Sequence, residues 1–570
     1  MSKADNKYER LSKERKELQA QGLIPEWFGT GGFQLFKERY EYETNGRSVK
    51  GQYERIAKTA AKHLKGTKWE SEAFDKFMWL MEDQILSCST PVFSNMGTDR
   101  GMPVSCSGGV VGDSVLGFYD SMREVAVLTK NGFGTSAYFG DIRPRGSSIS
   151  VGGKASGTMP VLVDHFSTAR NIAQGTARRG AFAGYVPITH GDFNEVADLL
   201  YNDPDDVNIG WCVYDDFIAA LNNEDREATR RFQRSLKVKS VQGKGYFMFM
   251  DKINRKRPAM YIQHGLTVKA SNLCTEITLF ADEDHTFTCV LASMIVATWA
   301  KWKDSDAVYW ATIFLDCVAQ EFIEKAQGIP ALEKAVRFTE KGRALGLGQC
   351  GYHTLLQENM LPYESFEAHM LSQEIAKHIH DESLRSSQDM AKELGEPEWC
   401  KGFGVRNTHR TAIAPTKSTA LLVGGISEGI NPDPAMVYTA DTSAGEIFRI
   451  NPVLLKIMKE RGKDDKKTLK SIADNVGSVQ HVDWLSDHEK EVFKTAFEIN
   501  QKTHILRCAA RGKYLCQWQS MNLSFGSEED EGWIAECMQE AMENEDVLGV
   551  YYFYMQAGIQ ASKGECVSCQ

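Results

Sequence analysis

One short stretch, residues 272–276, constrains this chain more than any other segment of its 570 residues. It reads Asn-Leu-Cys-Thr-Glu, and the β-branched residues at 275, 277 and 278 favour an extended backbone across 270–279. Side chains along a strand alternate between two faces, so Asn272, Cys274 and Glu276 would share one face. The stretch therefore predicts a strand that presents an amide, a thiol and a carboxyl to one pocket.

These three groups suit radical chemistry better than hydrolysis. No histidine stands beside Cys274 to generate a thiolate nucleophile. A neutral thiol in a dry pocket can instead lose a hydrogen atom and become a thiyl radical, while Glu276 takes a proton from a substrate hydroxyl. Asn272 would orient that substrate. A lone buried cysteine more often serves packing, so the choice depends on the rest of the chain.

The composition excludes several classes of protein. With 42% hydrophobic and 25% charged residues the chain is typical of a globular protein, and its net charge of -10 argues against a nucleic-acid surface. The longest apolar run, 289–300, is too short to cross a bilayer, and the first six residues lack the apolar core of a signal peptide. We therefore expect a cytoplasmic protein with no membrane segment. Its thirteen cysteines are then buried, catalytic or metal-binding, although no paired CxxC motifs predict a zinc site.

The first part of the chain is expected to be largely helical. Residues 3–22 carry leucines at the spacing of a surface helix, and residues 36–42 read as a short strand. Amphipathic helices are predicted from there to about residue 86. Beyond this region Cys106 and Cys289 each lie on an apolar, strand-like run, as Cys274 does. Asp113 and Ser114 stand where they can cap a helix that reaches about Lys130.

Glycine-rich segments with arginines follow at 131–135, 142–148 and 174–181. They suit a phosphorylated ligand, although each alone could be an ordinary turn. The segment 412–420 predicts a strand and then a hydroxyl-rich turn, whose backbone N–H groups and Lys417 could hold a phosphate. A plain helix cap is the alternative. The chain closes on Cys566-Val567-Ser568-Cys569, and a CxxC on a mobile terminus suits disulfide exchange.

Taken in order, these features resemble the large, catalytic subunit of class I aerobic ribonucleotide reductase over residues 36–570. The resemblance rests on Ile-Arg-Pro-Arg-Gly at 142–146, on 174–181, on 271–276, on 415–419 and on Gln-Ser-Met-Asn at 519–522. It implies an α/β fold: a ten-stranded α/β barrel of two parallel five-stranded halves, with Cys274 at the tip of a central finger loop. The implied domains are a helical region (1–65), the barrel (66–543) and a tail (544–570) with the radical-transfer tyrosines and a flexible redox-active end.

The resemblance also implies roles for single residues. Cys274 would be the transient thiyl, Glu276 the base on the ribose 3′ hydroxyl and Asn272 its partner, with Cys106 and Cys289 as the reducing dithiol. Tyr551 and Tyr552 are similar to the pair that passes a radical from a metal-containing small subunit. Cys566 and Cys569 would re-reduce the dithiol and then be reduced by thioredoxin or glutaredoxin. Further implied contacts are Thr90 and Ser105 with the ribose, Thr416, Ser418 and Thr419 with the phosphates, and Asp113, Ser114, Arg143 and Arg179 with a dNTP or ATP effector at a homodimer interface.

The chain also departs from the family pattern at several points. The barrel-like sequence begins too early for the extra N-terminal ATP-binding domain of many members, so we expect specificity control without that on/off site. Lys417 stands where relatives often have a small or acidic residue, and 515–518 is less acidic than the family pattern.

The nearest rival to the class I enzyme is a cobalamin-dependent reductase, against which Tyr551 and Tyr552 argue. The tail also lacks a glycyl-radical motif, and a non-catalytic nucleotide-binding paralogue would not need all four of Cys106, Cys274, Glu276 and Cys289.

Overall fold

The structure of the protein is a computed structural model that describes residues 3–42, 48–150, 152–174, 178–442 and 445–556. Its centre is one curled sheet of nine strands within those residues. Five consecutive neighbours are parallel: β2 (Cys106–Val110), β3 (Gly134–Tyr138), β6 (Phe182–Pro187), β7 (Ile209–Val213) and β8 (Tyr246–Phe249). This is one of the parallel five-stranded halves that the resemblance implies.

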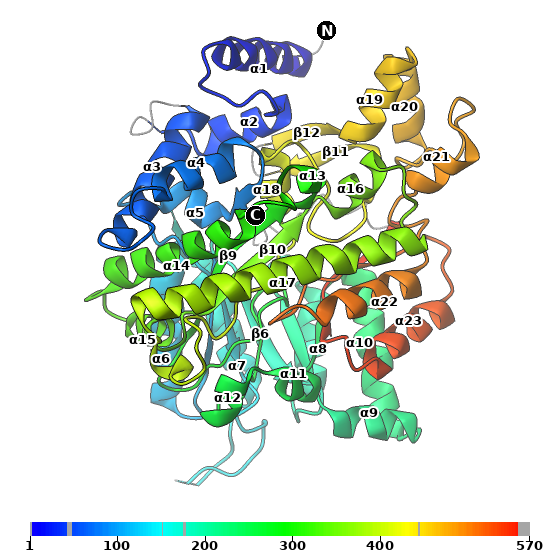
Figure 1. Cartoon of the computed structure of the whole chain (residues 1–570). Helices are drawn as coiled ribbons and strands as arrows, with labels where there is room; N and C mark the ends of the chain where they lie inside the picture. Colours follow the sequence, from blue (N-terminus) through cyan, green and yellow to red (C-terminus); the bar gives the residue numbers. More distant parts are fainter. Residues whose placement is uncertain (1–2, 43–47, 151, 175–177, 443–444, 557–570) are drawn as a thin grey trace.

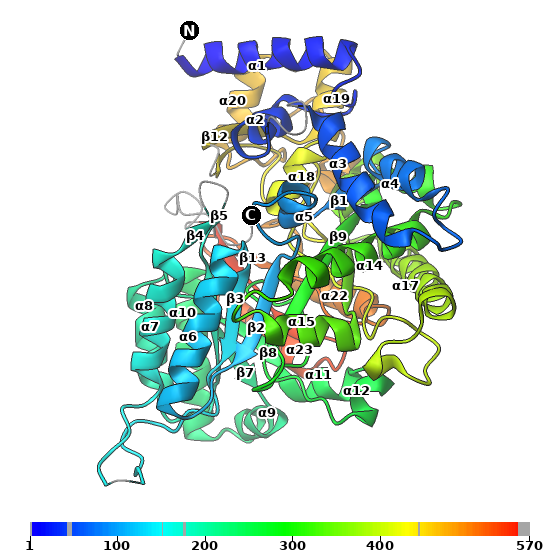
Figure 2. The ribbon, with the colours of Figure 1, turned by 90° about the vertical axis from the view of Figure 1, so that its left-hand side faces the viewer.

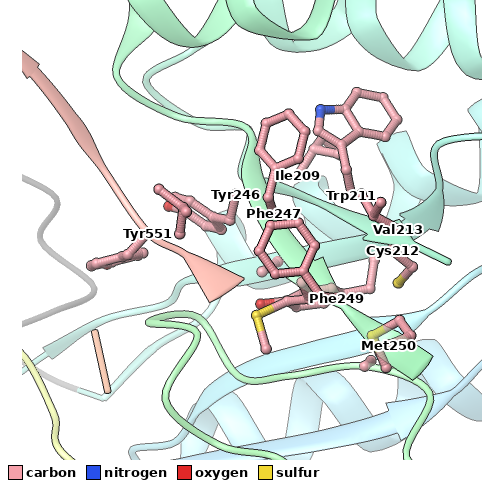
Figure 3. Packing of buried hydrophobic residues seen from close by; sticks show 14 of the residues in the cluster. Ile209, Trp211, Cys212, Val213, Tyr246, Phe247, Phe249, Met250 and Tyr551 are labelled. Carbon is pink, nitrogen blue, oxygen red and sulfur yellow. The ribbon is translucent and has the colours of Figure 1, made fainter. Parts of the chain in front are cut away.

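Helices cover the outer face of this half-barrel. They are α6 (Val115–Lys130), α7 (Thr158–Asn171), α8 (Phe193–Asn202) and α10 (Arg226–Gln242), and Figure 2 shows them side by side against the strands. Because helices lie on one face and the barrel interior on the other, β7 and β8 are buried along their whole length. Figure 3 shows the resulting core, in which Tyr551 packs beside Tyr246 of β8.

The second half of the barrel starts from β9 (Phe287–Ile295), which pairs antiparallel with β2 and parallel with β10 (Leu345–Cys350). The predicted strand within 412–420 is not regular: Thr411 and Ile413 make isolated bridges to Leu347 and Gln519. Gly348 permits this approach, since a Cβ there would lie 2.5 Å from the Ala412 carbonyl oxygen. β1 (Leu86–Cys88) and β14 (Gly549–Val550) add antiparallel strands to β9 and β8. The α/β barrel implied by the resemblance is thus confirmed, with nine regular strands in its sheet among the described residues.

The N-terminal region is helical, as expected, and lies at one end of the barrel with α1 (Lys3–Ala20) outermost (Figure 1). Helix α2 (Thr30–Arg39) occupies most of the segment predicted as a strand, so that prediction was wrong. Phe33 and Phe36 lie one turn apart and are both buried, which favours a helix at this position. α3 (Val49–Ala61) and α4 (Ala73–Glu82) complete the region. None of the described helices is long and apolar enough to cross a membrane.

The remaining helices surround the second half of the barrel. α14 (Ala307–Ala326), α15 (Glu333–Gly342) and α17 (Phe366–Leu394) pack together, and α17 also contacts α22 (Gln501–Gly512). The hairpin β11 (Val437–Thr442) and β12 (Gly445–Ile450) precedes α19 (Pro452–Glu460) and α20 (Lys466–Asp474), near a small separate core. The chain returns to the barrel through β13 (Leu523–Phe525), α23 (Glu531–Glu543) and β15 (Phe553–Met555).

Candidate active site

The stretch 272–276 is a loop rather than the predicted strand. Leu273 and Cys274 form a turn, and the Thr275 backbone has a φ of 66°. A β-branched residue rarely adopts this left-handed conformation, so the surrounding structure must stabilise it. The expectation of a finger loop with Cys274 in its turn agrees with this geometry, whereas the period-two argument for a shared strand face was wrong.

Distant parts of the chain hold the loop in place. The Tyr185 hydroxyl of β6 donates to the Asn272 carbonyl (2.6 Å), and the Ser136 hydroxyl of β3 donates to the Ser271 carbonyl (2.8 Å). From the other side, the Trp518 N–H donates to the Glu276 carbonyl (2.9 Å), and Gln517 accepts from the Thr278 N–H. The segment 515–518, which departs from the family pattern, thus has a structural role in supporting the loop.

The predicted amide, thiol and carboxyl do come together. Asn272 Nδ2 donates to Glu276 Oε1 (2.9 Å), and the Ser520 hydroxyl contacts both the Cys274 carbonyl (2.7 Å) and Glu276 Oε2 (3.2 Å). All four residues are buried. Burial raises the pKa of Glu276 to about 8, the neighbouring Cys106 adds to the rise, and the hydrogen bonds from Asn272 and Ser520 oppose it. A carboxyl with this pKa is suited to exchanging a proton near neutral pH.

Cys106 and Cys289 are cross-strand neighbours. They are register partners on β2 and β9, and both are buried. Burial raises the pKa of Cys289 well above its ordinary value, and a hydrogen bond with Cys106 raises it further. Cys289 therefore lies as a neutral thiol beside Cys106, and both are close to Glu276.

One pocket joins most of the predicted substrate site. Cys106, Cys274 and Glu276 lie in its wall. The predicted ribose and phosphate residues also line it: Thr90, Ser105, Thr416, Ser418 and Thr419. Residues that sequence reasoning missed complete the lining, namely Ser87, Ser89, Pro91, Leu291, Ala292, Ser293, Ala414 and Pro415. Ser89 Oγ is buried and has no hydrogen-bond partner, and its place immediately before Thr90 was the only sequence signal for it.

The hydroxyl-rich turn begins α18 (Lys417–Leu422). Thr416 precedes the helix with a φ of 57°, and its hydroxyl accepts from the Gly429 N–H (2.8 Å). The Lys417 ammonium does not follow the hydroxyls of Thr416 and Ser418 into the pocket wall. It lies 5.2 Å from the centre of the Tyr552 ring and 5.4 Å from that of Tyr554. The Lys417 ammonium therefore contacts aromatic rings, which the sequence around it did not indicate.

Tyr551 and Tyr552 lie between β14 and β15 in a larger cluster of tyrosines. Their ring centres are 4.3 Å apart, and Tyr246 lies 4.8 Å from Tyr551 and 5.5 Å from Tyr552. The Tyr246 and Tyr552 hydroxyls are 3.4 Å apart. The Tyr551 N–H donates to the Met521 carbonyl, and the adjacent Ser520 contacts Cys274, so a short backbone connection links the pair to the loop. Nothing in the sequence around Tyr246 indicated this long-range contact.

Three of the predicted effector residues, Asp113, Ser114 and Arg143, lie at the start of α6. Arg143 Nε donates to Asp113 Oδ2 (2.6 Å), and Ser114 caps α6 by accepting from the Gly117 N–H, as expected. Arg179 is in the two-residue strand β5 (Arg178–Arg179), which pairs with β4 (Ala173–Gln174). The first turns of α6, which follow Asp113 and Ser114, expose three apolar side chains: Val115, Leu116 and Tyr119.

The predicted terminal cysteines are not part of this geometry. Cys566 and Cys569 lie outside the described residues. Among the described residues, one group could offer several metal-ligating atoms, His63 with Glu321 and Glu324, and these residues do not line the pocket. Glu321 already pairs with Lys62 there (2.6 Å).

Comparisons with known proteins agree on one family. The model of the ribonucleotide reductase barrel domain matches residues 104–237, 219–403 and 398–553, and that of the all-alpha domain matches 26–101. A putative ribonucleoside-diphosphate reductase large subunit of Frog virus 3 is 31% identical over 85% of this chain and 90% of its own. A vitamin B12-dependent reductase of Thermoplasma acidophilum is 28% identical over 80% of this chain and 62% of its own.

The solved structure of an Actinobacillus ureae class Id ribonucleotide reductase alpha subunit is also similar. It superposes with a TM-score of 0.85 at 37% sequence identity, and the match covers 93% of this chain and 97% of that one.

Proposed function

The chain belongs to the ribonucleotide reductase large-subunit family as the catalytic subunit, and we propose that it reduces ribonucleoside diphosphates to 2′-deoxyribonucleoside diphosphates. One observation carries the proposal. A single pocket brings the Cys274 thiol, the Glu276 carboxyl and the Cys106 thiol together, with Cys289 opposite Cys106 on the neighbouring strand. This set of groups provides a hydrogen-atom acceptor, a proton acceptor and a two-electron reductant.

The reaction follows from these groups. The Cys274 thiyl removes the ribose 3′ hydrogen atom while Glu276 takes the 3′-hydroxyl proton. The 2′ hydroxyl then leaves as water with a proton from the thiol pair. Cys106 and Cys289 supply two electrons and become a disulfide, and the second thiol proton goes with those electrons to C2′ as its new hydrogen. Glu276 returns its proton to the 3′ oxygen, and Cys274 returns its hydrogen atom to C3′ and is again a thiyl. Asn272 and Ser520 orient Glu276 throughout by hydrogen bonds to its two oxygens.

The residues that line the pocket support one orientation of a bound nucleotide, with its ribose at the cysteines and its phosphates at the hydroxyl-rich turn. Thr90 and Ser105 lie with the catalytic cysteines and contact the ribose in this proposal, whereas Thr416, Ser418 and Thr419 bind the phosphates. Hydroxyls and N–H groups at the start of a short helical turn are suitable phosphate partners. The same five residues belong to one connected cavity, as a ligand with both sugar and phosphate requires.

The tyrosine cluster supports radical delivery from outside the chain. In our proposal a metal-containing small subunit oxidises Tyr552, Tyr552 oxidises Tyr551, and Tyr551 oxidises Cys274. Ring centres 4.3 Å apart favour transfer between the two phenols. A cobalamin-dependent enzyme would have no use for such a route, so the cluster favours the class I mechanism.

Regulation and re-reduction are further parts of the proposal. A dNTP or ATP would bind near Asp113, Ser114 and Arg143, with Arg179 in the loop between effector and substrate. The exposed apolar side chains at the start of α6 favour a homodimer there, because such patches commonly mark interfaces. Cys566 and Cys569 would reduce the internal disulfide by thiol exchange and become a disulfide themselves. Thioredoxin or glutaredoxin would then reduce that disulfide in the reducing cytoplasm.

The test is formation of dCDP from CDP by the purified chain with dithiothreitol and an ATP or dNTP effector. A cognate small subunit is compared with adenosylcobalamin alone, and Cys274→Ser serves as the control variant. We expect product only with the small subunit and none from the variant. Turnover with adenosylcobalamin alone would assign the chain to the cobalamin-dependent class. No turnover with either radical source would contradict a catalytic role.

A further inference from the structure

Lys417 connects two parts of the site that have separate roles. Its neighbours in the chain, Thr416 and Ser418, line the pocket where the phosphates are proposed to bind. Its own ammonium lies over the rings of Tyr552 (5.2 Å) and Tyr554 (5.4 Å). Those two rings are stacked, with centres 5.7 Å apart and planes 23° apart, so one ammonium contacts both. The residue therefore joins the phosphate turn to the outer tyrosine.

An ammonium in this position affects the oxidation of Tyr552. The face of an aromatic ring is electron-rich and attracts a cation within about 6 Å. Removal of an electron from that ring opposes the attraction, so Tyr552 is harder to oxidise while the ammonium is close. A second lysine near the cluster, Lys239 of α10, donates to the Tyr551 carbonyl and lies 4.7 Å from the Phe553 ring and 5.7 Å from the Tyr246 ring. Burial holds the pKa of Lys239 well below its ordinary value. Among the described residues, Lys417 is the lysine whose ammonium lies over the Tyr552 ring.

A phosphate on the turn would compete for the same ammonium. A lysine ammonium is a compact charge on a flexible stem, and an anion attracts it more strongly than the face of a neutral ring does. The backbone of Lys417 belongs to the turn, so its side chain has little distance to travel. Movement toward the phosphate removes the positive charge from the Tyr552 ring and makes that ring easier to oxidise.

We propose that Lys417 couples binding of the nucleotide phosphates to oxidation of Tyr552, so that the radical enters when substrate is present. This inference rests on the proposed function. In the step concerned, Tyr552 gives one electron and its phenolic proton to the oxidised residue of the small subunit, which is thereby reduced. Tyr552 regains both from Tyr551, which regains them from the Cys274 thiol. Lys417 is a positioning residue here and takes no part in the bond changes.

The experiment follows radical formation at residue 552. The tyrosine is replaced by 3-aminotyrosine, whose radical is trapped and identified by electron paramagnetic resonance, in the full chain mixed with the small subunit. The rate of radical formation is measured with and without CDP in the parent, in Lys417→Met and in Lys417→Arg. We expect CDP to accelerate the reaction in the parent and in Lys417→Arg. In Lys417→Met the rate should be high and independent of CDP.

A matched control removes a cation from an aromatic ring elsewhere. The Lys68 ammonium lies 4.9 Å from the Trp69 ring, in the N-terminal helical region, and Lys68→Met should respond to CDP as the parent does. If Lys417→Met retains the acceleration and only its KM for CDP rises, Lys417 is a phosphate ligand and the coupling is wrong. If the parent gives neither a radical at residue 552 nor dCDP, the proposed function itself fails.

Discussion

Cys106 and Cys289 face each other as register partners on the antiparallel strands β2 and β9. The Cα atoms of opposite residues in such a pair are about 4.5–5.5 Å apart, and a disulfide needs about 4.4–6.8 Å. The two thiols can therefore be oxidised without movement of the barrel strands. The sheet itself holds the reductant beside Glu276 and Cys274.

The first prediction concerns this thiol pair. In a single turnover without external reductant, Cys106 and Cys289 should form a disulfide, detected by differential alkylation and mass spectrometry. Cys289→Ser should form no such bond and should lose multiple turnover with dithiothreitol, because one thiol cannot supply two electrons. Cys317→Ser, at another buried cysteine, is the control and should behave as the parent. Normal turnover by Cys289→Ser would contradict the assignment.

The second prediction is a pH dependence set by Glu276. Its pKa is about 8 in the folded protein, and only the ionised form can accept the 3′-hydroxyl proton. The value of kcat/KM for CDP should therefore rise with pH and level off above about 8. Glu276→Gln should lower kcat by roughly 10²–10⁴-fold, the usual contribution of a positioned base. A profile in the parent that is flat from pH 6 to pH 9 would exclude Glu276 as that base.

The free energy of unfolding should also depend on Glu276, and it should fall with increasing pH where kcat/KM rises. The pKa of Glu276 rises from an ordinary value of 4.5 in the unfolded chain to about 8 in the folded one. Between these values the folded state binds the proton more tightly, so the free energy of unfolding falls as pH increases. Glu276→Gln lacks this titration. Its melting temperature should exceed that of the parent by a margin that grows between pH 5 and pH 8, and a constant margin would contradict the raised pKa.

Ser520→Ala tests the hydrogen bond to Glu276 Oε2. The hydroxyl favours the ionised carboxylate, so its loss should raise the pKa of Glu276 further. The rise of kcat/KM should move to higher pH, with a smaller change in its plateau. Ser386→Ala removes another buried hydroxyl, bonded to the Tyr309 carbonyl, and should leave the profile in place. A purely structural role of Ser520 would lower activity equally at every pH.

A buried ion pair provides a prediction about the fold. Arg343 and Arg406 both donate to Asp316, and their charges hold its pKa below the ordinary value although burial opposes this. Asp316→Ala would leave two guanidinium groups without their partner, at a cost of about 3–5 kcal/mol in the free energy of unfolding. Urea denaturation measures the loss. The control is Glu195→Ala, which breaks an exposed pair with Arg145 and should cost about 0–1 kcal/mol.

Much of the fold and of the site could be predicted from local sequence. The apolar runs around Cys106 and Cys289 form strands as expected, and Ser114 caps α6 at the predicted position. These features depend on neighbouring residues, whose periodicity and capping groups are visible in the chain. The predicted pocket residues also meet, because the motifs that carry them resemble one family over almost the whole chain.

The sequence by itself thus determined which chemical groups this protein has, along with most of the helices and strands that carry them. Only the tertiary structure decided how the groups meet. Residues 270–279 have strand-forming composition, yet Thr275 adopts a left-handed backbone because contacts from Tyr185, Gln517 and Trp518 outweigh local propensity. In the same way, Lys417 points to Tyr552 and not into the pocket wall. Such choices depend on residues far away in the chain, whose positions no local pattern contains.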